Sequence, residues 1–344
     1  MEVKNKFLYF SAINFIHRED IPWKSFQRKT FVITGSTGLI GSQLVRVLLS
    51  RNDQFGSSCK LILPVRNITK AQMMFGERPD IVYIQWELDS EVLALDSSAD
   101  YFIHAACGTS SKAFLNNPAS TISSIVNGAE TTLRAAQRCD VDKYLFLSTM
   151  EVYGEVSRTA VETNLGSLDP MVVRNSYPEA KKLVECLCAS YYSEFSLHTI
   201  VLRLAQTFGQ GVSSDDERVF AEFGRHAAKG EDIILFSDGK KKNMYLSVND
   251  AVSAILFGLA YGEPGNVYNA ANEATYCSVE EMANMVIRTF GKQGTSVQHK
   301  TDKQREASFR KSSDLRMDCS KLNQLGWVPV DDLRSMYQSM MDCW

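Results

Sequence analysis

The amino-acid sequence predicts an α/β protein whose main domain is a doubly wound parallel sheet, followed by a smaller α/β domain. Two observations carry this prediction. Over residues 29–150, apolar runs of strand length alternate with stretches of helical spacing. A glycine-rich turn at residues 35–41 joins the first apolar run to the first helical stretch. With 344 residues, 44% of them apolar and 22% charged, the chain can bury one large core or two smaller ones.

Each expected strand is a run of apolar side chains of strand length. These runs are residues 31–34, 61–65, 81–84, 101–104, 144–148 and 199–204. Apolar residues at helical spacing predict helices at residues 39–49, 122–138 and 177–194. The apolar stretch 7–16 runs into charged residues without a cleavage site, so we expect an N-terminal helix on the domain surface and no targeting segment.

Charge and cysteine content exclude several classes of function. Acidic side chains number 40 and basic ones 37, so the chain has no strong positive field for nucleic acid or an anionic membrane surface. It also lacks a run of about 18 apolar residues, which a transmembrane helix requires. Eight scattered cysteines without a C-x-x-C pair or a histidine cluster predict reduced thiols in the cytoplasm and no metal site.

The turn Gly35-Ser36-Thr37-Gly38-Leu39-Ile40-Gly41 has the composition and position of a dinucleotide-binding loop. Its glycines allow the backbone to approach a pyrophosphate, and the N-terminus of the following helix offers free N–H groups and a partial positive charge. We therefore expect Gly35, Thr37, Gly38, Leu39, Ile40 and Gly41 to bind the cofactor. The alternative is a tight turn between strand and helix that binds no ligand.

Residues after the second and third strands are expected to contact the adenosine end of the cofactor. Arg66 stands where a carboxylate would bind the ribose of NAD, which favours NADP, although a solvated arginine is the alternative. Glu87 and Leu88 are placed to cap the adenine. The sequence therefore predicts NAD or NADP without deciding between them.

Tyr177 and Lys181 lie four residues apart, on one face of a predicted helix. A tyrosine has an ordinary pKa of about 10, so it acts as a base near neutral pH only where a cation stabilises the phenolate. Ser148 and Thr149 end a predicted strand and offer a hydroxyl for the same substrate oxygen. These residues form a candidate catalytic site.

In this order the motifs resemble the extended short-chain dehydrogenase/reductases that modify nucleotide sugars, over roughly residues 29 to 330. The segments that carry the resemblance are the three glycines, His104-Ala105-Ala106, Asn127, Ser148-Thr149, Tyr177 with Lys181, Arg203, and residues 325–329. The UDP-glucuronate decarboxylase branch is the most similar. Residues 148–154 resemble its S-T-S-E-V-Y-G segment, and residues 216–219, followed by Phe223, resemble its diphosphate-binding segment.

The resemblance implies a Rossmann fold, a nucleotide-sugar substrate, a homodimer and further site residues. Ala105, Ala106 and Leu204 would join the cofactor site. The implied substrate-binding residues are Thr149, Glu151, Gln206, Arg218, Val219 and Asn243. Asn243 replaces a family arginine and Gln206 a family asparagine, and Met150 stands where sugar dehydratases carry the aspartate that helps to expel water.

Three domain regions are expected. Residues 1–28 form an N-terminal extension, residues 29–209 the dinucleotide-binding domain, and residues 210–344 mainly the substrate-binding domain, with part of 232–262 returning to the first domain. Charge and serine in residues 301–316 predict a solvated loop or lid. Lys240, Lys241 and Lys242 are interpreted as a solvated turn, with a phosphate clamp as the alternative, and His104 as a packed residue at a strand end, with a catalyst as the alternative.

The lead hypothesis is an enzyme that oxidises a nucleotide sugar at C4 with NAD or NADP. Tyr177 takes the hydroxyl proton, Lys181 lowers the pKa of Tyr177, Thr149 or Ser148 positions the oxygen, and Glu151 is a second acid or base. The transient ketone then permits epimerisation, decarboxylation or elimination. The alternatives are an NADPH-dependent 4-keto-sugar reductase and a non-catalytic dinucleotide-binding protein.

Apolar surface on two helices predicts assembly. Residues 122–138 and 177–194 carry more apolar side chains than covering one sheet face requires. Pairing these helices across a two-fold axis would bury that surface in a homodimer. The alternative is that residues 7–25 fold back over it and keep the chain monomeric.

Overall fold

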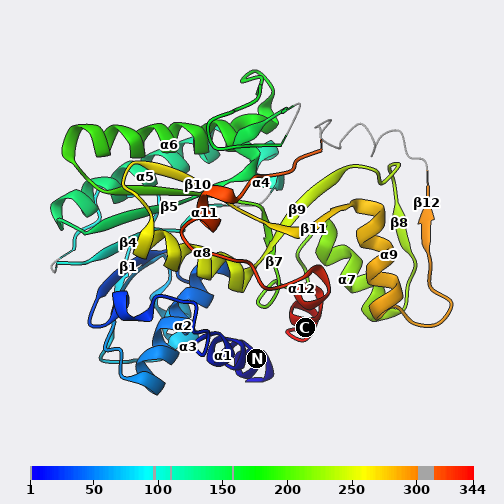
Figure 1. Cartoon of the computed structure of the whole chain (residues 1–344), viewed down its shortest axis with the longest axis horizontal. Coiled ribbons are helices and arrows are strands. Elements are labelled where there is room, and N and C mark those ends of the chain that lie inside the picture. The colour runs from blue at the N-terminus through cyan, green and yellow to red at the C-terminus, as the bar shows by residue number, and fades with distance from the viewer. Residues whose placement is uncertain (1, 96–97, 109–110, 157–158, 301–313) are drawn as a thin grey trace.

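A computed structural model describes residues 2–95, 98–108, 111–156, 159–300 and 314–344 (Figure 1). Its centre is a seven-stranded parallel sheet in the order β10-β6-β5-β4-β1-β2-β3. The strands are β1 (Thr30–Thr34), β2 (Lys60–Val65), β3 (Ile81–Gln85), β4 (Tyr101–His104), β5 (Lys143–Thr149), β6 (Thr199–Leu204) and β10 (Asn266–Ala270). Strand order reverses between β1 and β4, as in doubly wound sheets, and the predicted fold class is confirmed.

Helices cover both faces of this sheet (Figure 1). One face carries α1 (Glu2–Phe15), α2 (Leu39–Phe55), α3 (Ile68–Phe75) and α8 (Val248–Tyr261), and the other carries α4 (Ser111–Asn116), α5 (Pro118–Arg138) and α6 (Ser176–Phe195). Alternate side chains of β1 serve the two faces: Phe31 and Ile33 lie in the core under α2 and α8, and Val32 lies in the core under α5 and α6. This alternation explains why the strand reads as an unbroken apolar run.

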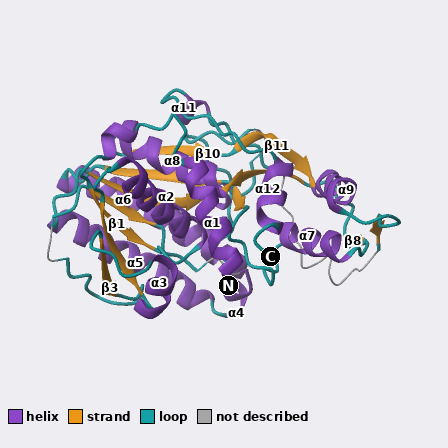
Figure 2. Cartoon of the chain, turned by 90° about the horizontal axis from the view of Figure 1, so that it is seen from below, coloured by secondary structure: helices purple, strands orange, loops and turns teal. Residues whose placement is uncertain are grey.

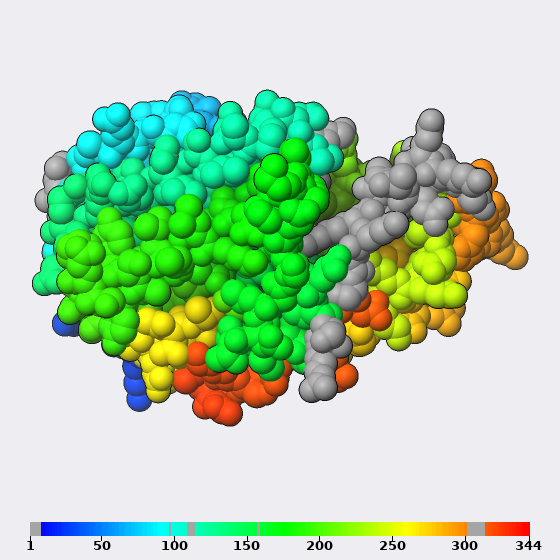
Figure 3. Space-filling model, turned by 90° about the horizontal axis from the view of Figure 1, so that it is seen from above, coloured from blue at the N-terminus to red at the C-terminus, as the bar shows by residue number. Residues whose placement is uncertain are grey.

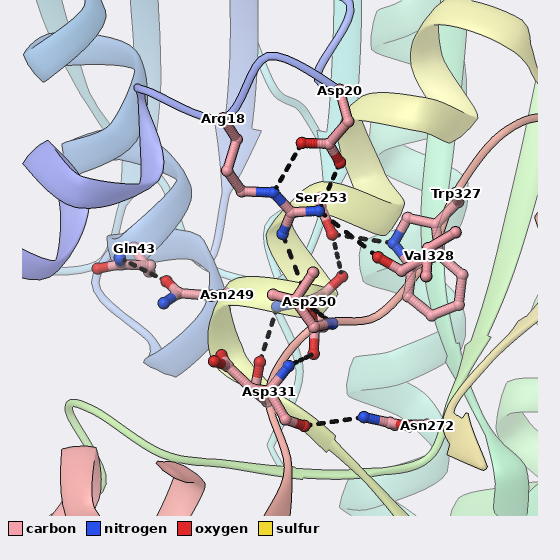
Figure 4. A network of polar contacts seen from close by, with 12 residues as sticks. Arg18, Asp20, Gln43, Asn249, Asp250, Ser253, Asn272, Trp327, Val328 and Asp331 are labelled. Atoms are coloured by element: carbon pink, nitrogen blue, oxygen red, sulfur yellow. Dashed lines mark hydrogen bonds and ion pairs between the residues drawn. The ribbon is translucent and has the colours of Figure 1, made fainter. Parts of the chain in front are cut away.

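The N-terminal extension packs on the α2 side of the sheet, and the expected N-terminal helix is confirmed as α1. Phe15 and Trp23, the latter in η1 (Trp23–Phe26), are buried there with their rings edge to face at 6.2 Å. Arg18 Nη1 lies 3.7 Å from the buried Asp250 Oδ1, and this carboxylate accepts backbone N–H groups near the C-terminus (Figure 4). The alternative in which residues 7–25 cover α5 and α6 is therefore wrong, because their apolar side chains are buried on the opposite face.

A second group of elements stands apart from the large sheet (Figure 2). It contains a three-stranded sheet of β7 (Gln206–Phe208), β9 (Lys242–Ser247) and β11 (Asn272–Ser278), and a pair of β8 (Ile233–Leu235) with β12 (Val297–His299). Its helices are α7 (Val219–Lys229), α9 (Val279–Phe290) and α12 (Leu333–Met341), and they enclose a separate core around Phe208, Phe220 and Tyr337. The short helix α11 (Ser320–Asn323) contacts β10 instead.

The chain returns from the smaller group to the large sheet, and the returning elements fall only partly within residues 232–262, which were expected to return. The returning elements are α8 and β10, whereas residues 232–247 carry β8 and β9 of the smaller sheets. The apolar character of α8 explains its return, because most of its side chains are buried. Of the expected lid, residues 301–313 lie outside the described residues. No helix among the described residues is long and apolar enough to cross a membrane.

Two phenylalanines of α1 test whether the extension is part of the core. Phe15 is 4% exposed and Phe10 is 59% exposed. We expect Phe15→Ala to lower the free energy of unfolding by about 3–5 kcal/mol, because it leaves a cavity in the core. Phe10→Ala on the same helix should change it by less than about 0.5 kcal/mol. Urea unfolding of both variants measures the difference, and equal small effects would show that α1 is only loosely attached.

Candidate functional site

A cavity of about 450 Å³ lies at the carboxyl ends of the parallel strands, next to the smaller domain. The glycine loop after β1 lines one end, and residues of β7, β9 and the start of α7 line the other. Tyr177 and Lys181, from the first turns of α6, are also in its lining. The loops after parallel strands meet at one edge of the sheet, which brings segments far apart in the sequence into one site.

Most of the predicted site residues share this cavity. Its lining contains Gly35, Gly38, Leu39, Ile40, Gly41, Ala105, Ser148, Thr149, Glu151, Tyr177, Lys181, Leu204, Gln206, Arg218 and Asn243. Six predicted residues are absent from the described lining: Thr37, Arg66, Glu87, Leu88, Ala106 and Val219. Arg66 is exposed, Leu88 packs against Gly128 of α5, and Val219 packs on the core of the smaller domain.

The glycine loop is shaped so that side chains would block it. Gly35 has a φ of +69°, and a Cβ there would lie 2.6 Å from the backbone of Ala105 and Ala106. A Cβ at Gly41 would lie 2.3 Å from the carbonyl oxygen of Gly35. The buried Ser36 hydroxyl has no hydrogen-bond partner among the described residues, and Gly38 is the N-cap of α2. Open backbone and free N–H groups at a helix N-terminus fit the pyrophosphate of NAD.

Tyr177 is buried between a hydroxyl and an aromatic ring. Its phenol lines the cavity together with Thr149, and its ring stacks on Phe114 of α4 at 4.4 Å between centroids. Burial raises the pKa of Tyr177 well above its ordinary value, and the neighbouring Cys107 and Glu151 raise it further. Hydrogen bonding to Thr149 and the charge of Arg174 act in the opposite direction and lower the pKa of Tyr177.

Arg174 is a site residue that the sequence analysis missed. It lies in η3 (Val173–Asn175), over the ring of Phe114 at 5.2 Å, and its Nη2 lies 3.0 Å from Glu151 Oε2. It precedes Tyr177 by three residues, so spacing of one helical turn was the available signal. The cation that lowers the Tyr177 pKa in this geometry is therefore Arg174.

Lys181 was expected to lower the pKa of Tyr177, and the structure gives it a different contact. Its Nζ donates to the carbonyl oxygen of Leu147 at 2.8 Å and lies 4.5 Å from the ring centroid of Phe146. Lys181 is thereby tied to β5, and it lines the cavity beside Tyr177. Its Nζ also lies 6.0 Å from the ring centroid of Tyr177, and its effect on the Tyr177 pKa stays a prediction.

The hydroxyls of Ser148 and Thr149 have different partners. Ser148 Oγ donates to Glu185 Oε1 of α6 at 2.5 Å, inside a buried network. Arg203 of β6 donates to Glu185 Oε2 at 2.6 Å and to the Tyr153 hydroxyl at 3.1 Å. Thr149 instead contacts Tyr177 and accepts the N–H of Glu151 at 3.2 Å. The geometry therefore favours Thr149 over Ser148 as the hydroxyl that faces substrate.

His104 has the packed position that the sequence predicts. It is 2% exposed, its Nδ1 lies 2.8 Å from Thr34 Oγ1, and its ring stacks on Phe146. Burial, with a smaller effect from Lys181, lowers the pKa of His104 to about 3, so it is neutral. The described residues contain no group of three metal-ligating side chains.

The far end of the cavity carries polar and basic groups from the smaller domain. Arg218, the N-cap of α7, donates to the carboxylate of Asp216 at 2.6 Å. Gln206 comes from β7 and Asn243 from β9. The sequence analysis did not name Cys107, Phe114, Thr207 or Leu315 as site residues, and all of them line the cavity. Lys241, interpreted from the sequence as part of a solvated turn, lines this end as well.

Comparison with known proteins identifies the family. Residues 31–271 match the model of the NAD dependent epimerase/dehydratase family. The chain belongs to this family. It is 28% identical over 309 residues to UDP-glucuronic acid decarboxylase 2 of Arabidopsis thaliana, covering 88% of this chain and 65% of that protein's length.

Solved structures of this family share the fold. The epimerase Mth375 of Methanothermobacter thermautotrophicus superposes with a TM-score of 0.77 at 18% identity, covering 93% of both chains. UDP-glucuronic acid 4-epimerase of Bacillus cereus, solved with UDP-glucuronic acid and NAD, superposes with a TM-score of 0.74 at 20% identity. That match covers 91% of this chain and 98% of the other.

The buried pair of Arg203 and Glu185 offers a test of how α6 is held. Arg203→Met leaves the Glu185 carboxylate buried without its cation, so we expect it to lower the free energy of unfolding by about 3–5 kcal/mol. The double variant Arg203→Met/Glu185→Leu removes both charges and should recover at least half of that loss. Denaturant unfolding measures both, and a single variant as stable as the parent chain would mean that the pair does not hold the helix.

Proposed function

We propose that this protein binds NAD and a nucleotide sugar in one cavity and oxidises the sugar transiently at C4. One observation carries the proposal: Tyr177 and Thr149 line a cavity that has the glycine loop at one end and Arg218 with Asn243 at the other. A dinucleotide at the first end and a nucleotide sugar at the second would meet beside Tyr177. The family model and the curated relatives support this assignment.

The proton is handled by Tyr177 and Thr149. The Thr149 hydroxyl donates to the sugar oxygen and holds it against the phenol, and Tyr177 accepts the hydroxyl proton. Because burial raises the pKa of Tyr177 and the Thr149 proton is donated to the sugar, the Arg174 charge must offset that effect for the phenol to act as a base. When bound, NAD supplies the acceptor and later the donor of hydride. Lys181, anchored on the Leu147 carbonyl, binds the ribose of the cofactor.

The step that follows oxidation would use Glu151. Its carboxylate lies beside Tyr177 and pairs with Arg174, so it can accept or deliver a proton at the carbons next to the ketone. Met150 is in the lining in place of the acid that eliminates water, which favours epimerisation or decarboxylation over elimination. UDP-linked sugars, UDP-glucuronic acid first, are the substrates to test, because relatives named for that compound match along this chain.

The catalytic role of Tyr177 predicts a selective loss of turnover. We expect Tyr177→Phe to lower kcat at least about 1000-fold while NAD affinity changes less than threefold, because only the proton acceptor is removed. Turnover of UDP-glucuronic acid and UDP-glucose, with NAD binding by fluorescence, measures both. Ser148→Ala is the matched control, since its hydroxyl donates to Glu185, and it should retain at least about a tenth of kcat. Full activity of Tyr177→Phe would exclude this mechanism.

We also propose a homodimer built on α5 and α6. This face, seen in Figure 3, carries the exposed apolar side chains Ile122 and Leu183. Val126 and Leu187, one helical turn after Ile122 and Leu183, are partly exposed. Because the N-terminal extension lies on the opposite face, pairing of two copies is the remaining way to bury this surface.

If α5 and α6 form the dimer interface, a charged residue introduced on that face should lower the molecular mass measured in solution. Leu183→Glu should convert the chain from a dimer to a monomer of about 38.6 kDa in light scattering, because it places a carboxylate in the interface. Val82→Glu, on the exposed side of β3, is the matched control and should leave the mass unchanged. A monomeric parent chain at micromolar concentration would refute the dimer.

We propose the cytoplasm as the location. All eight cysteines are free thiols in the structure, and several are buried where oxidation would disturb packing. A reducing compartment suits that arrangement.

A further inference from the structure

The N-terminal extension contacts the start of α8, where two connections between the domains are fixed (Figure 4). Asn249 and Asp250 lie in the first turn of α8, and each has a partner in the extension. The Nδ2 of Asn249 donates to Ser11 Oγ of α1 at 3.5 Å, and Arg18 Nη1 lies 3.7 Å from Asp250 Oδ1. The extension precedes residues 31–271, which match the family model, so these contacts are added to the part of the chain that the family shares.

Asn249 joins the two ends of the cavity through a pair of buried amides. Its Oδ1 accepts Gln43 Nε2 of α2 at 3.0 Å and Gln210 Nε2 at 2.6 Å. Gln43 lies in the first turns of α2, directly after the glycine loop. Gln210 follows β7, which lines the other end of the cavity. The connection from β7 to the smaller domain is therefore bonded to the same side chain as the helix that follows the glycine loop.

Leu8 of α1 packs against this connection. A Cβ at Gly211 would lie 3.6 Å from Leu8 Cδ2 and 3.3 Å from Leu39 Cδ1. Leu39 begins α2, lines the cavity and packs on the core of the smaller domain. Because Leu8 is 5% exposed, its side chain fills space between α1 and the connection.

Asp250 fixes a second connection between the domains. Its carboxylate oxygens accept the backbone N–H groups of Val330 and Asp331 at 2.9 Å and 3.1 Å. This stretch leads directly into α12, which packs in the core of the smaller domain. Arg18 Nη2 donates to the carbonyl oxygen of Val328 at 3.5 Å. Arg18 therefore contacts both the connection and the carboxylate that fixes it.

We propose that the N-terminal extension positions the smaller domain for binding of the nucleotide sugar, a role that rests on the proposed function. Arg18 and Leu8 are positioning residues, because neither is among the described residues that line the cavity and each contacts a connection between the domains. The glycine loop belongs to the large domain alone, whereas a nucleotide sugar contacts both domains. Loosening a connection populates other orientations of the smaller domain, so it should weaken nucleotide-sugar binding more than NAD binding.

The test compares UDP and NAD binding to the full chain by isothermal titration calorimetry. Arg18→Met should weaken UDP binding by about fivefold to twentyfold in the presence of saturating NAD, because less of the protein has the smaller domain in place. The NAD affinity of the same variant should stay within about twofold of the parent chain. Arg18→Lys keeps the positive charge and should weaken UDP binding by less than about threefold. Lys24→Met removes an exposed charge from the same extension, so this matched control should leave both affinities unchanged.

Leu8→Ala tests the same role without changing a charge, and it replaces Arg18→Met if that variant does not fold. It should also weaken UDP binding selectively, whereas Phe10→Ala, on the exposed face of the same helix, should not. UDP affinity within about twofold of the parent chain in both Arg18→Met and Leu8→Ala would show that the extension only stabilises the fold. Equal weakening of UDP and NAD binding would likewise overturn the positioning role. A parent chain that binds NAD but neither UDP nor UDP-glucuronic acid overturns the proposed function itself.

Discussion

Glu185 and Arg203 form a buried ion pair between α6 and β6, and the geometry of the site depends on it. Glu185 also accepts the Ser148 hydroxyl of β5, and Lys181 donates to the Leu147 carbonyl of the same strand. These contacts fix the register of α6 along the two strands. An unpaired charge at either position would be costly in the core, so the helix is held in one place. Tyr177, two turns before Glu185, is thereby set against Thr149 at the end of β5.

Neighbouring residues at the end of β5 have different roles: one anchors α6, and the other lies in the candidate site. Ser148 and Thr149 are neighbours in sequence, yet one hydroxyl holds the helix and the other contacts the phenol. Arg174 and Phe114 complete the surroundings of Tyr177 from η3 and α4. Burial favours the neutral phenol, whereas Arg174 favours the phenolate, so the basicity of Tyr177 is a balance of these effects. Glu151 pairs with Arg174 and raises the pKa of Tyr177, so it takes part in the same balance.

The sequence allowed much of the fold to be predicted because periodicity and loop composition are local properties. Six of the seven strands in the large sheet coincide with apolar runs, and the glycine loop lies where strand and helix meet. β10 was missed because its Asn266 to Ala270 stretch lacks a long apolar run. The position of the N-terminal helix depends on which face offers a matching apolar surface, which only the tertiary structure shows.

The sequence motifs predicted which residues form the site, but not which side chains contact one another there. The four-residue spacing indicated Tyr177 and Lys181 as a pair. It could not show that Lys181 donates to the carbonyl of Leu147, or that Arg174 lowers the pKa of Tyr177. Lys241 was interpreted as solvated because three adjacent lysines look alike in sequence. Lys242 begins β9 and pairs with Ser278, whereas Lys240 and Lys241 precede the strand, so the three side chains have different surroundings. Such side-chain directions are properties of the assembled sheet.

Transient oxidation is tested most directly by following absorbance at 340 nm while NAD-loaded protein turns over UDP-glucuronic acid deuterated at C4. Internal recycling predicts a rise and fall of absorbance within each turnover, no net NADH, and deuterium retained in the product. Stoichiometric accumulation of NADH, or turnover that consumes added NADPH, would contradict recycling and support a one-way oxidoreductase.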